Sequence, residues 1–268
     1  MVHIVELPST SVPESSLYVA TPCYGCLVTH AYTSSILRLQ AECMRRGITC
    51  FIDFIGNESL VQRARNVLAA RFLKRRDDFT HFLFIDADIA FDPETVFRML
   101  EFDKDVTTSI YPKKSIDWNM VSQKLKANAD EPVHQMGLDF NINIIGHSTQ
   151  VVDGFMKVLD AATGFMMMKR SLLEKMAHKF ANTLTCENDI PGSRDDIPFY
   201  VALFDCILEP LPNGKFRALS EDYSFCRRVQ ELGGHVYVDV SSVLCHTGNM
   251  LLVESIRDKP LNQLNIKA

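Results

Sequence analysis

The chain has 268 residues, with 28 basic and 33 acidic side chains and a formal net charge of −5. Hydrophobic residues make up 47% and charged residues 23%, which is the composition of a globular protein. A broad nucleic-acid-binding face needs a basic excess, which is absent here. No run of eighteen apolar residues predicts a membrane span, and the N-terminus has no basic start and long apolar run typical of a secretory signal.

The eight cysteines lie at positions 23, 26, 43, 50, 186, 206, 226 and 245. Several of them lie inside apolar runs, as Cys50 and Cys245 do. Reduced, buried thiols of a cytoplasmic protein show this pattern, because cysteine behaves there as a small hydrophobe. The expected compartment is therefore the cytoplasm.

The first half of the chain alternates strand and helix signals. Short apolar runs predict strands over residues 17–20, 50–55, 81–85 and 106–110. Helices are expected over about 33–46, from a cap at 57–59 through 73, and from 92–94 onward, where Pro93 suits a first turn. This order predicts an α/β fold with a doubly wound sheet, whose ligands bind beyond the carboxyl ends of the strands.

The second half is less regular. Residues 111–150 show weak periodicity and predict long irregular connections. Asn213-Gly214 predicts a tight turn between short strands. Further strands are expected near 156–159, 164–168 and 236–240, and helices over 171–180 and 220–232.

The most apolar predicted strand, residues 81–85, ends at Asp86, and Asp88 follows one residue later. Two carboxylates there repel each other unless a cation or a proton lies between them. Mg²⁺ and Mn²⁺ prefer such oxygen ligands and take the others from water and phosphates. An Asp-x-Asp pair also arises by chance as two solvated side chains, but its position after a buried strand favours a metal site.

Two further motifs lie in the second half. Glu221 and Asp222 come at a predicted helix start, where acids suit the helix dipole, and one of them could act as a general base on a hydroxyl. His246 follows a predicted strand. A lone histidine is more often structural, yet a neutral imidazole can complete a metal shell.

In their order along the chain, these motifs resemble the GT-A glycosyltransferases, particularly small members from viruses, phages and bacteria. The matching segments are Thr21-Pro22, residues 58–66, Asp86-Ala87-Asp88, residues 163–165 with 169–170, residues 220–222 and residues 246–248. The resemblance implies a Rossmann-like, doubly wound mixed sheet with helices on both faces, in one domain over residues 1–268. Within it, a nucleotide-binding half is expected at about 15–110, an acceptor-side half at about 111–250 and a C-terminal extension at 251–268.

The resemblance also implies roles for single residues. Asp88 is expected to bind a divalent cation, Asp86 to lie near the ribose or the cation, and His246 to be the C-terminal cation ligand. Asp222, or Glu221 in its place, is similar to the catalytic base of inverting members. The expected contacts with the nucleotide sugar are Thr21, Pro22, Tyr24, Asp53, Arg65, Asp86, Ala87 and Gly164.

The implied reaction moves a sugar, as in the hexosyltransferases, from a nucleotide-diphosphate donor to an acceptor hydroxyl with inversion at the anomeric carbon. Mn²⁺ or Mg²⁺ is the expected cation, and a UDP-sugar is preferred over guanosine and thymidine forms. The acceptor stays open between a glycan, a lipid carrier, a protein and a modified nucleobase. If the chain is viral, the host cytoplasm is its expected location.

Three alternatives compete with this interpretation. Phosphatases of the haloacid-dehalogenase type also use Asp-x-Asp after a buried strand, with the first aspartate as nucleophile, but two strand–helix units precede Asp86 here. Cys23-Tyr24-Gly25-Cys26 is similar to a thioredoxin-like redox pair, which would leave the acidic motifs unexplained. A nucleotide-sugar-binding protein without catalysis is the third alternative.

Overall fold

In the computed structural model, residues 15–75, 78–145 and 150–248 are described, and their centre is a nine-stranded mixed sheet. Its order is β2-β1-β3-β9-β5-β14-β8-β6, with β7 also paired to β8. Neighbours β2, β1 and β3 are parallel, as are β5 and β14, whereas β9 runs antiparallel between β3 and β5. The strands are β1 (Ser16–Cys23), β2 (Thr49–Gly56), β3 (His81–Ile85), β5 (Val106–Ser109), β6 (Ile142–Ile144), β7 (Val151–Val152), β8 (Phe155–Ala161), β9 (Phe165–Lys169) and β14 (Val236–Asp239).

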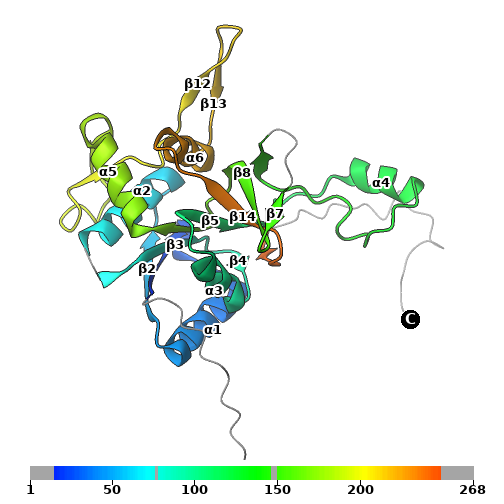
Figure 1. Cartoon of the computed structure of the whole chain (residues 1–268), viewed down its shortest axis with the longest axis horizontal. Coiled ribbons are helices and arrows are strands. Elements are labelled where there is room, and N and C mark those ends of the chain that lie inside the picture. The colour runs from blue at the N-terminus through cyan, green and yellow to red at the C-terminus, as the bar shows by residue number, and fades with distance from the viewer. Residues whose placement is uncertain (1–14, 76–77, 146–149, 249–268) are drawn as a thin grey trace, which may run out of the picture.

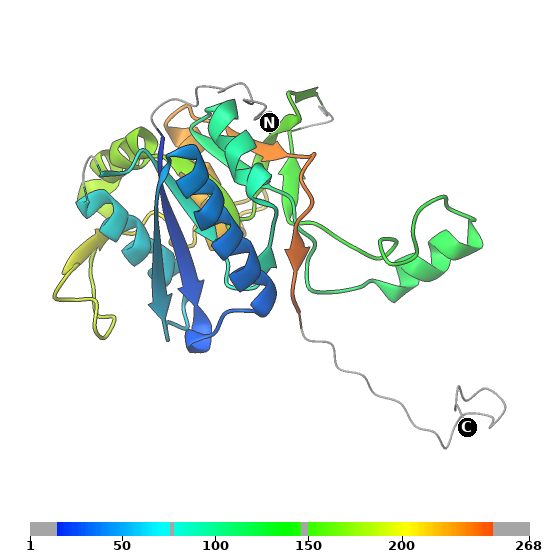
Figure 2. The same ribbon diagram turned by 90° about the horizontal axis from the view of Figure 1, so that it is seen from below.

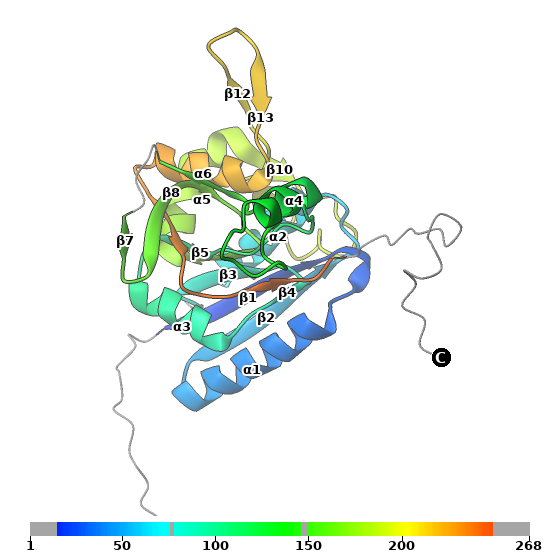
Figure 3. The ribbon, with the colours of Figure 1, turned by 90° about the vertical axis from the view of Figure 1, so that its right-hand side faces the viewer.

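Helices cover both faces of this sheet, as Figures 1 and 3 show. On one face lie α1 (His30–Arg46) and α3 (Pro93–Phe102), which enclose a core that includes Leu39 and Phe97. On the other lie α2 (Val61–Lys74), α5 (Arg170–Leu184) and α6 (Glu221–Glu231), which enclose a core that includes Phe72 and Phe204. The expected α/β fold, a Rossmann-like mixed sheet with helices on both faces, is confirmed.

Local capping explains the helix ends. The side chain of Thr29 accepts from the Tyr32 N–H and starts α1 three residues before the predicted position, and Gly47 ends it with φ 70°. Glycine adopts this left-handed conformation without a steric penalty. Asp92 caps α3 through the Glu94 N–H, as its sequence predicted.

Two further predicted boundaries differ from the structure. β1 runs on through Pro22, where a loop was expected, because β1 pairs with β2 as far as Cys23 but with β3 only as far as Ala20. One side of the strand is thus unpaired there, which suits a residue without an N–H. The second helix starts at Val61 after Leu60, and the predicted cap over 57–59 lies before it as a turn.

Residues 111–141 form an excursion from the sheet that we call the arm, and Figures 1 and 2 show it projecting from the body. The expectation of purely irregular structure is wrong here, because the arm contains α4 (Trp118–Lys126), with Met136 and Val121 buried inside the arm. Its two ends are joined where Pro112 pairs with Phe140 and the Lys113 N–H donates to the Asp139 carbonyl at 2.8 Å.

Three small two-stranded sheets complete the fold. The hairpin of β12 (Leu208–Pro210) and β13 (Phe216–Ala218) contains the predicted Asn213-Gly214 turn, and β10 (Thr185–Glu187) pairs with β11 (Phe199–Val201). β4 (Ile89–Ala90) pairs with β15 (Cys245–His246), which brings the end of the described chain to the carboxyl end of β3. None of the helices in the described ranges has the length and apolar character to cross a membrane. The expected extension at 251–268 lies outside the described residues.

Candidate active site

The turn after β3 carries the Asp86-Ala87-Asp88 motif. β3 is buried along its whole length, and the backbone N–H of Asp86 donates to the Gly164 carbonyl at 2.8 Å. The Asp86 carbonyl accepts from the Ile89 N–H at 3.1 Å, which closes a turn before β4. The strand therefore holds both aspartates at the carboxyl end of the sheet, where α/β folds bind ligands.

Asp88 lies between His246 and Lys114. The pairing of β15 with β4 sets His246 opposite Ile89, and the Thr247 N–H donates to the Asp88 carbonyl at 2.9 Å. His246 Nε2 lies 3.4 Å from Asp88 Oδ1, and the Lys114 ammonium pairs with Asp88 Oδ2. Burial alone would raise the pKa of Asp88, but hydrogen bonds from His246 and Lys114 outweigh it and hold that pKa below its usual range.

The Asp88–His246 pair fits a divalent cation. His246 Nδ1 lies 2.8 Å from the Pro112 carbonyl, which can only accept, so Nδ1 carries a proton and Nε2 is the ring nitrogen that faces Asp88. Two ligands at right angles around Mg²⁺ lie about 3 Å apart, close to the 3.4 Å between these two atoms. In the described part of the chain, no three His, Cys, Asp or Glu side chains form a metal shell. A cation here would take its other ligands from water and phosphate.

Arg65 joins the two acidic motifs. It lies on α2 and is 2% exposed, so its guanidinium does not lie on a solvated face of the helix. Its Nη2 donates to both carboxylate oxygens of Asp86 at 3.0 and 3.3 Å, and its Nε lies 3.6 Å from Glu221 Oε1. Within the described residues its Nη1 has no hydrogen-bond partner, which leaves a buried donor for a ligand.

Gly164 permits a close approach between protein groups. A Cβ at this position would lie 2.3 Å from Tyr111 Oη and 2.6 Å from Asp86 Oδ2. The Gly164 N–H donates to Tyr111 Oη at 3.0 Å. The missing side chain thus allows Tyr111, which follows β5, to contact the strand ends beside Asp86.

The surroundings of Asp222 raise the pKa of its carboxyl group into the range of a proton acceptor. Its side chain is buried in the first turn of α6, and burial, followed by the charge and hydrogen bond of Glu221, raises its pKa to about 7. Asn141 Nδ2 donates to Asp222 Oδ2 at 3.4 Å, while Asn141 Oδ1 accepts from the Tyr223 hydroxyl at 2.7 Å. The tyrosine therefore orients the amide so that its N–H faces the carboxylate.

A cleft of ≈ 630 Å³ opens beside the two aspartates. This volume is in the range of pockets that take small molecules and cofactors. The described residues that line it are Pro22, Tyr24, Leu27, Val28, Thr29, Glu58, Ser59, Val61, Asp86, Ala87, Asp88, Lys114, Thr247 and Gly248. Of the expected nucleotide-sugar contacts, Pro22, Tyr24, Asp86 and Ala87 therefore share one cleft.

Two other expected contacts, Thr21 and Asp53, do not line the cleft. Thr21 is fully buried, and its hydroxyl shares a hydrogen bond with the Tyr32 hydroxyl at 2.7 Å. Asp53 accepts from the Tyr18 hydroxyl at 2.5 Å and from Arg71 at 3.2 Å. Neither residue is among the described residues that line the cleft.

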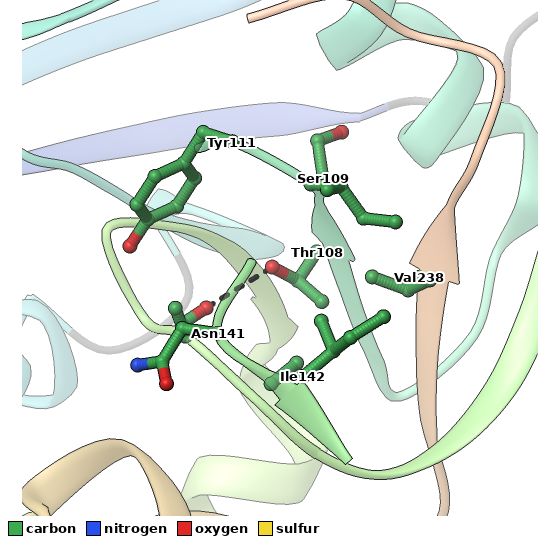
Figure 4. A pocket seen from close by; sticks show the side chains of 9 residues that line it. Thr108, Ser109, Tyr111, Asn141, Ile142 and Val238 are labelled. Atoms are coloured by element: carbon green, nitrogen blue, oxygen red, sulfur yellow. Dashed lines mark hydrogen bonds between the residues drawn. The ribbon is translucent and has the colours of Figure 1, made fainter. Parts of the chain in front are cut away.

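A much smaller cavity of ≈ 10 Å³ lies between the ends of the arm, as Figure 4 shows. Tyr111 and Asn141 lie on two sides of it, and Thr108 Oγ1 donates to the Ala162 carbonyl at 3.1 Å across its wall. A space of this size is at the lower limit for one water molecule. The cavity therefore leaves no room for a sugar.

The geometry disfavours a redox function for the Cys23–Cys26 segment. The Cys23 thiol is buried, and burial raises its pKa to about 11. Reactive thiols have a lowered pKa and partial exposure. All eight cysteines are free in the structure.

Several residues of the site were missed or left open by the sequence analysis. Glu58 and Ser59 entered only as part of a matching segment, and Lys114 was not assigned to the site. Tyr111 and Lys114 follow the carboxyl end of β5, so their position after a strand of the sheet was the available signal. Asn141 precedes the short strand β6 and had no comparable signal.

No family model and no curated protein matches the chain. Among solved structures it is similar to A197 from STIV, at 14% identity over 88% of this chain and 86% of the other, with a TM-score of 0.44. It is also similar to GalNAc-T7 with UDP, GalNAc and Mn2+, at 10% identity over 87% of this chain and 43% of the other, with a TM-score of 0.41. A glycosyltransferase involved in the glycosylation of the major capsid of PBCV-1 has 11% identity over 88% of this chain and 96% of the other, with a TM-score of 0.33.

Proposed function

We propose that this chain is a metal-dependent glycosyltransferase that moves a sugar from a nucleotide-diphosphate donor to an acceptor hydroxyl. The observation that carries the proposal is the Asp88–His246 pair, in which the imidazole Nε2 faces a carboxylate oxygen at 3.4 Å. The pair lies at the cleft of ≈ 630 Å³, in which Asp88 is a lining residue. When Nε2 carries no proton, both atoms can bind one divalent cation, and a diphosphate supplies the ligands that the protein does not.

In this proposal the cation, Mn²⁺ or Mg²⁺, would be held by Asp88 and His246 and would offset the charge of the departing nucleoside diphosphate. Asp222 accepts the proton of the acceptor hydroxyl as that hydroxyl attacks the anomeric carbon. A pKa of about 7 suits this task, because a general base works best when its pKa is near the working pH. Attack from the face opposite the diphosphate inverts the anomeric carbon.

The cleft residues would bind the nucleotide. Tyr24 is 77% exposed at the cleft and offers a ring to the base or ribose, with Pro22 beside it. We propose UDP as the nucleotide, a donor-binding half at about residues 15–110 and an acceptor-side half at about 111–250. We also propose a cytoplasmic location.

The phosphatase alternative is not favoured by this geometry. In that chemistry the first aspartate attacks a phosphate, so its carboxylate must be free to reach the phosphorus. Here Asp86 pairs with Arg65, whereas Asp88 pairs with Lys114 and His246. The two carboxylates therefore have separate partners.

Calorimetric titration of UDP tests the proposal, first with Mn²⁺ and then without metal. Binding that needs Mn²⁺ and that is lost in Asp88→Asn is the expected result, and a screen of UDP-sugars with NMR of the product would then give the anomeric configuration. The titration is repeated with GDP and TDP. If none of the three binds under any condition, the proposal is wrong, and a product that keeps the donor configuration would contradict inversion.

A further inference from the structure

Two adjacent lysines at the start of the arm have the same exposure but different partners. The Lys113 side chain is 43% exposed, and its ammonium pairs with Asp139 at 2.6 Å in the other leg of the arm. The Lys114 side chain is 41% exposed and pairs instead with Asp88 at the cleft. One lysine thus joins the ends of the arm, and the other reaches into the candidate active site.

The ammonium of Lys114 lies beside the position where a divalent cation would bind. Both carboxylate oxygens of Asp88 face a positive or protonatable partner, since Oδ2 pairs with Lys114 and Oδ1 faces His246. A divalent cation bound by the same carboxylate would lie next to the ammonium. Two positive charges on the same carboxylate repel each other strongly in a partly buried site. The cation and the ammonium therefore compete for Asp88.

The packing around the lysine stem favours this pairing. A Cβ at Gly248 would lie 3.0 Å from Lys114 Cβ and 3.1 Å from its Cγ, so the stem lies directly against the backbone of Gly248. The distal part is less confined, because two fifths of the side chain is exposed. The ammonium can therefore leave Asp88 while the base of the side chain stays in place.

The charges that line the cleft indicate where the ammonium goes. Its described lining contains three carboxylates, those of Glu58, Asp86 and Asp88, and a single lysine. Asp86 pairs with Arg65, and Glu58 lies 3.4 Å from Arg63, so Lys114 is the described lining residue whose charge can move to a diphosphate. Lysine binds phosphate as a mobile point charge on a flexible stem.

We propose, on the basis of the proposed function, that Lys114 competes with the divalent cation for Asp88 and moves to the diphosphate when the donor binds. The ammonium and the divalent cation then both neutralise the diphosphate. Binding of the cation is consequently weak in the absence of nucleotide and strong in its presence. Lys114 is a positioning residue that couples the two ligands.

Mn²⁺ binding, measured by the EPR signal of the free ion, tests this proposal directly. The parent chain is compared with Lys114→Met, with Lys114→Arg and with the matched control Lys113→Met, each without and with UDP. Without UDP, we expect Lys114→Met to bind Mn²⁺ about tenfold or more tightly than the parent. Lys114→Arg keeps the competing charge and is expected to bind weakly, as are Lys113→Met and the parent.

With UDP, the parent is expected to gain Mn²⁺ affinity, and Lys114→Met to gain much less. Thermal unfolding of all four proteins confirms that each is folded, which is expected because both lysines are partly exposed. Equal Mn²⁺ affinity of the parent and Lys114→Met without UDP overturns the inference, even if UDP binds normally. A different outcome is possible, in which Lys114→Met binds Mn²⁺ more tightly but no variant binds UDP. That outcome overturns the proposed function and the movement of Lys114 to the diphosphate. Parent protein that binds UDP equally well with and without Mn²⁺ also overturns the inference, because the lysine would then replace the cation permanently.

Discussion

The raised pKa of Asp222 makes the free energy of unfolding depend on pH. Burial, and then Glu221, raise this pKa from 3.8 to about 7. Between these values the unfolded chain has lost a proton that the folded chain still holds, so stability falls as the pH rises through this window. At about 1.36 kcal/mol for each pH unit of pKa difference, the loss is about 4 kcal/mol at most, and it is complete above the folded pKa.

Asp222→Asn keeps the shape of the side chain and removes its charge. We expect the variant to unfold with a higher free energy than the parent, by up to about 4 kcal/mol at pH 8, and with a smaller difference at pH 5. Urea unfolding at pH 5, 6, 7 and 8 measures the difference, with the exposed Asp195→Asn as control. The same Asp222 variant is expected to lose sugar transfer by about 10²- to 10⁴-fold. Parallel stability curves of parent and Asp222→Asn over this range would refute the reasoning.

Three further predictions concern the cleft and its wall. Gly164→Ala places a methyl group 2.3 Å from Tyr111 Oη. We expect the free energy of unfolding in urea to fall by about 1–3 kcal/mol and UDP binding, measured by calorimetry, to weaken. Unchanged values of both would contradict the close approach. Arg65→Met leaves the partly buried carboxylates of Asp86 and Glu221 without this partner and should cost about 1–3 kcal/mol. Because the charge of Arg65 lowers the pKa of Asp222, the pH profile of transfer should also move to higher pH, and a fixed profile would argue against coupling. Tyr24→Ala should weaken UDP binding about tenfold without changing stability, and equal affinity would exclude contact with the base.

The sequence predicts the main sheet and its acidic motif because both depend on local patterns. The strand over residues 81–85 is continuously apolar and its end at Asp86 is visible in the sequence, as is the capping of α3 by Asp92. The expected position of the cation pair depended on family resemblance instead. His246 approaches Asp88 through the pairing of two-residue strands, β4 and β15, which carry no periodic signal.

Arg65 shows a signal that was present but not used. Leu68, Ala69 and Phe72 follow it at helical spacing, and all four side chains are buried on the same helix face. A charged residue in an apolar stripe indicates a buried partner, because an unpaired buried charge is costly. The partner itself, Asp86, lies on another element and could be found only in the structure.

Helix α4 was missed although the sequence carries a short helical pattern. Trp118, Val121 and Leu125 recur at helical spacing, and this signal was not used. Val121 is its one buried side chain among the described residues, so the helix does not pack on the main core. It packs within the arm, where the Asp117 N–H donates to the Gly137 carbonyl at 3.0 Å.

The closed base of the arm has a consequence for how proteins of this architecture diverge. Because the Pro112–Phe140 pairing and the Lys113–Asp139 ion pair join the two legs next to the strand ends, the positions of Tyr111 and Asn141 do not depend on the length of chain between the legs. Insertions, deletions or replacement of residues 115–138 leave the chemical groups at the base in register. Under the proposed function, the outer arm is therefore the part of the acceptor side that can change while the proposed reaction centre stays in place.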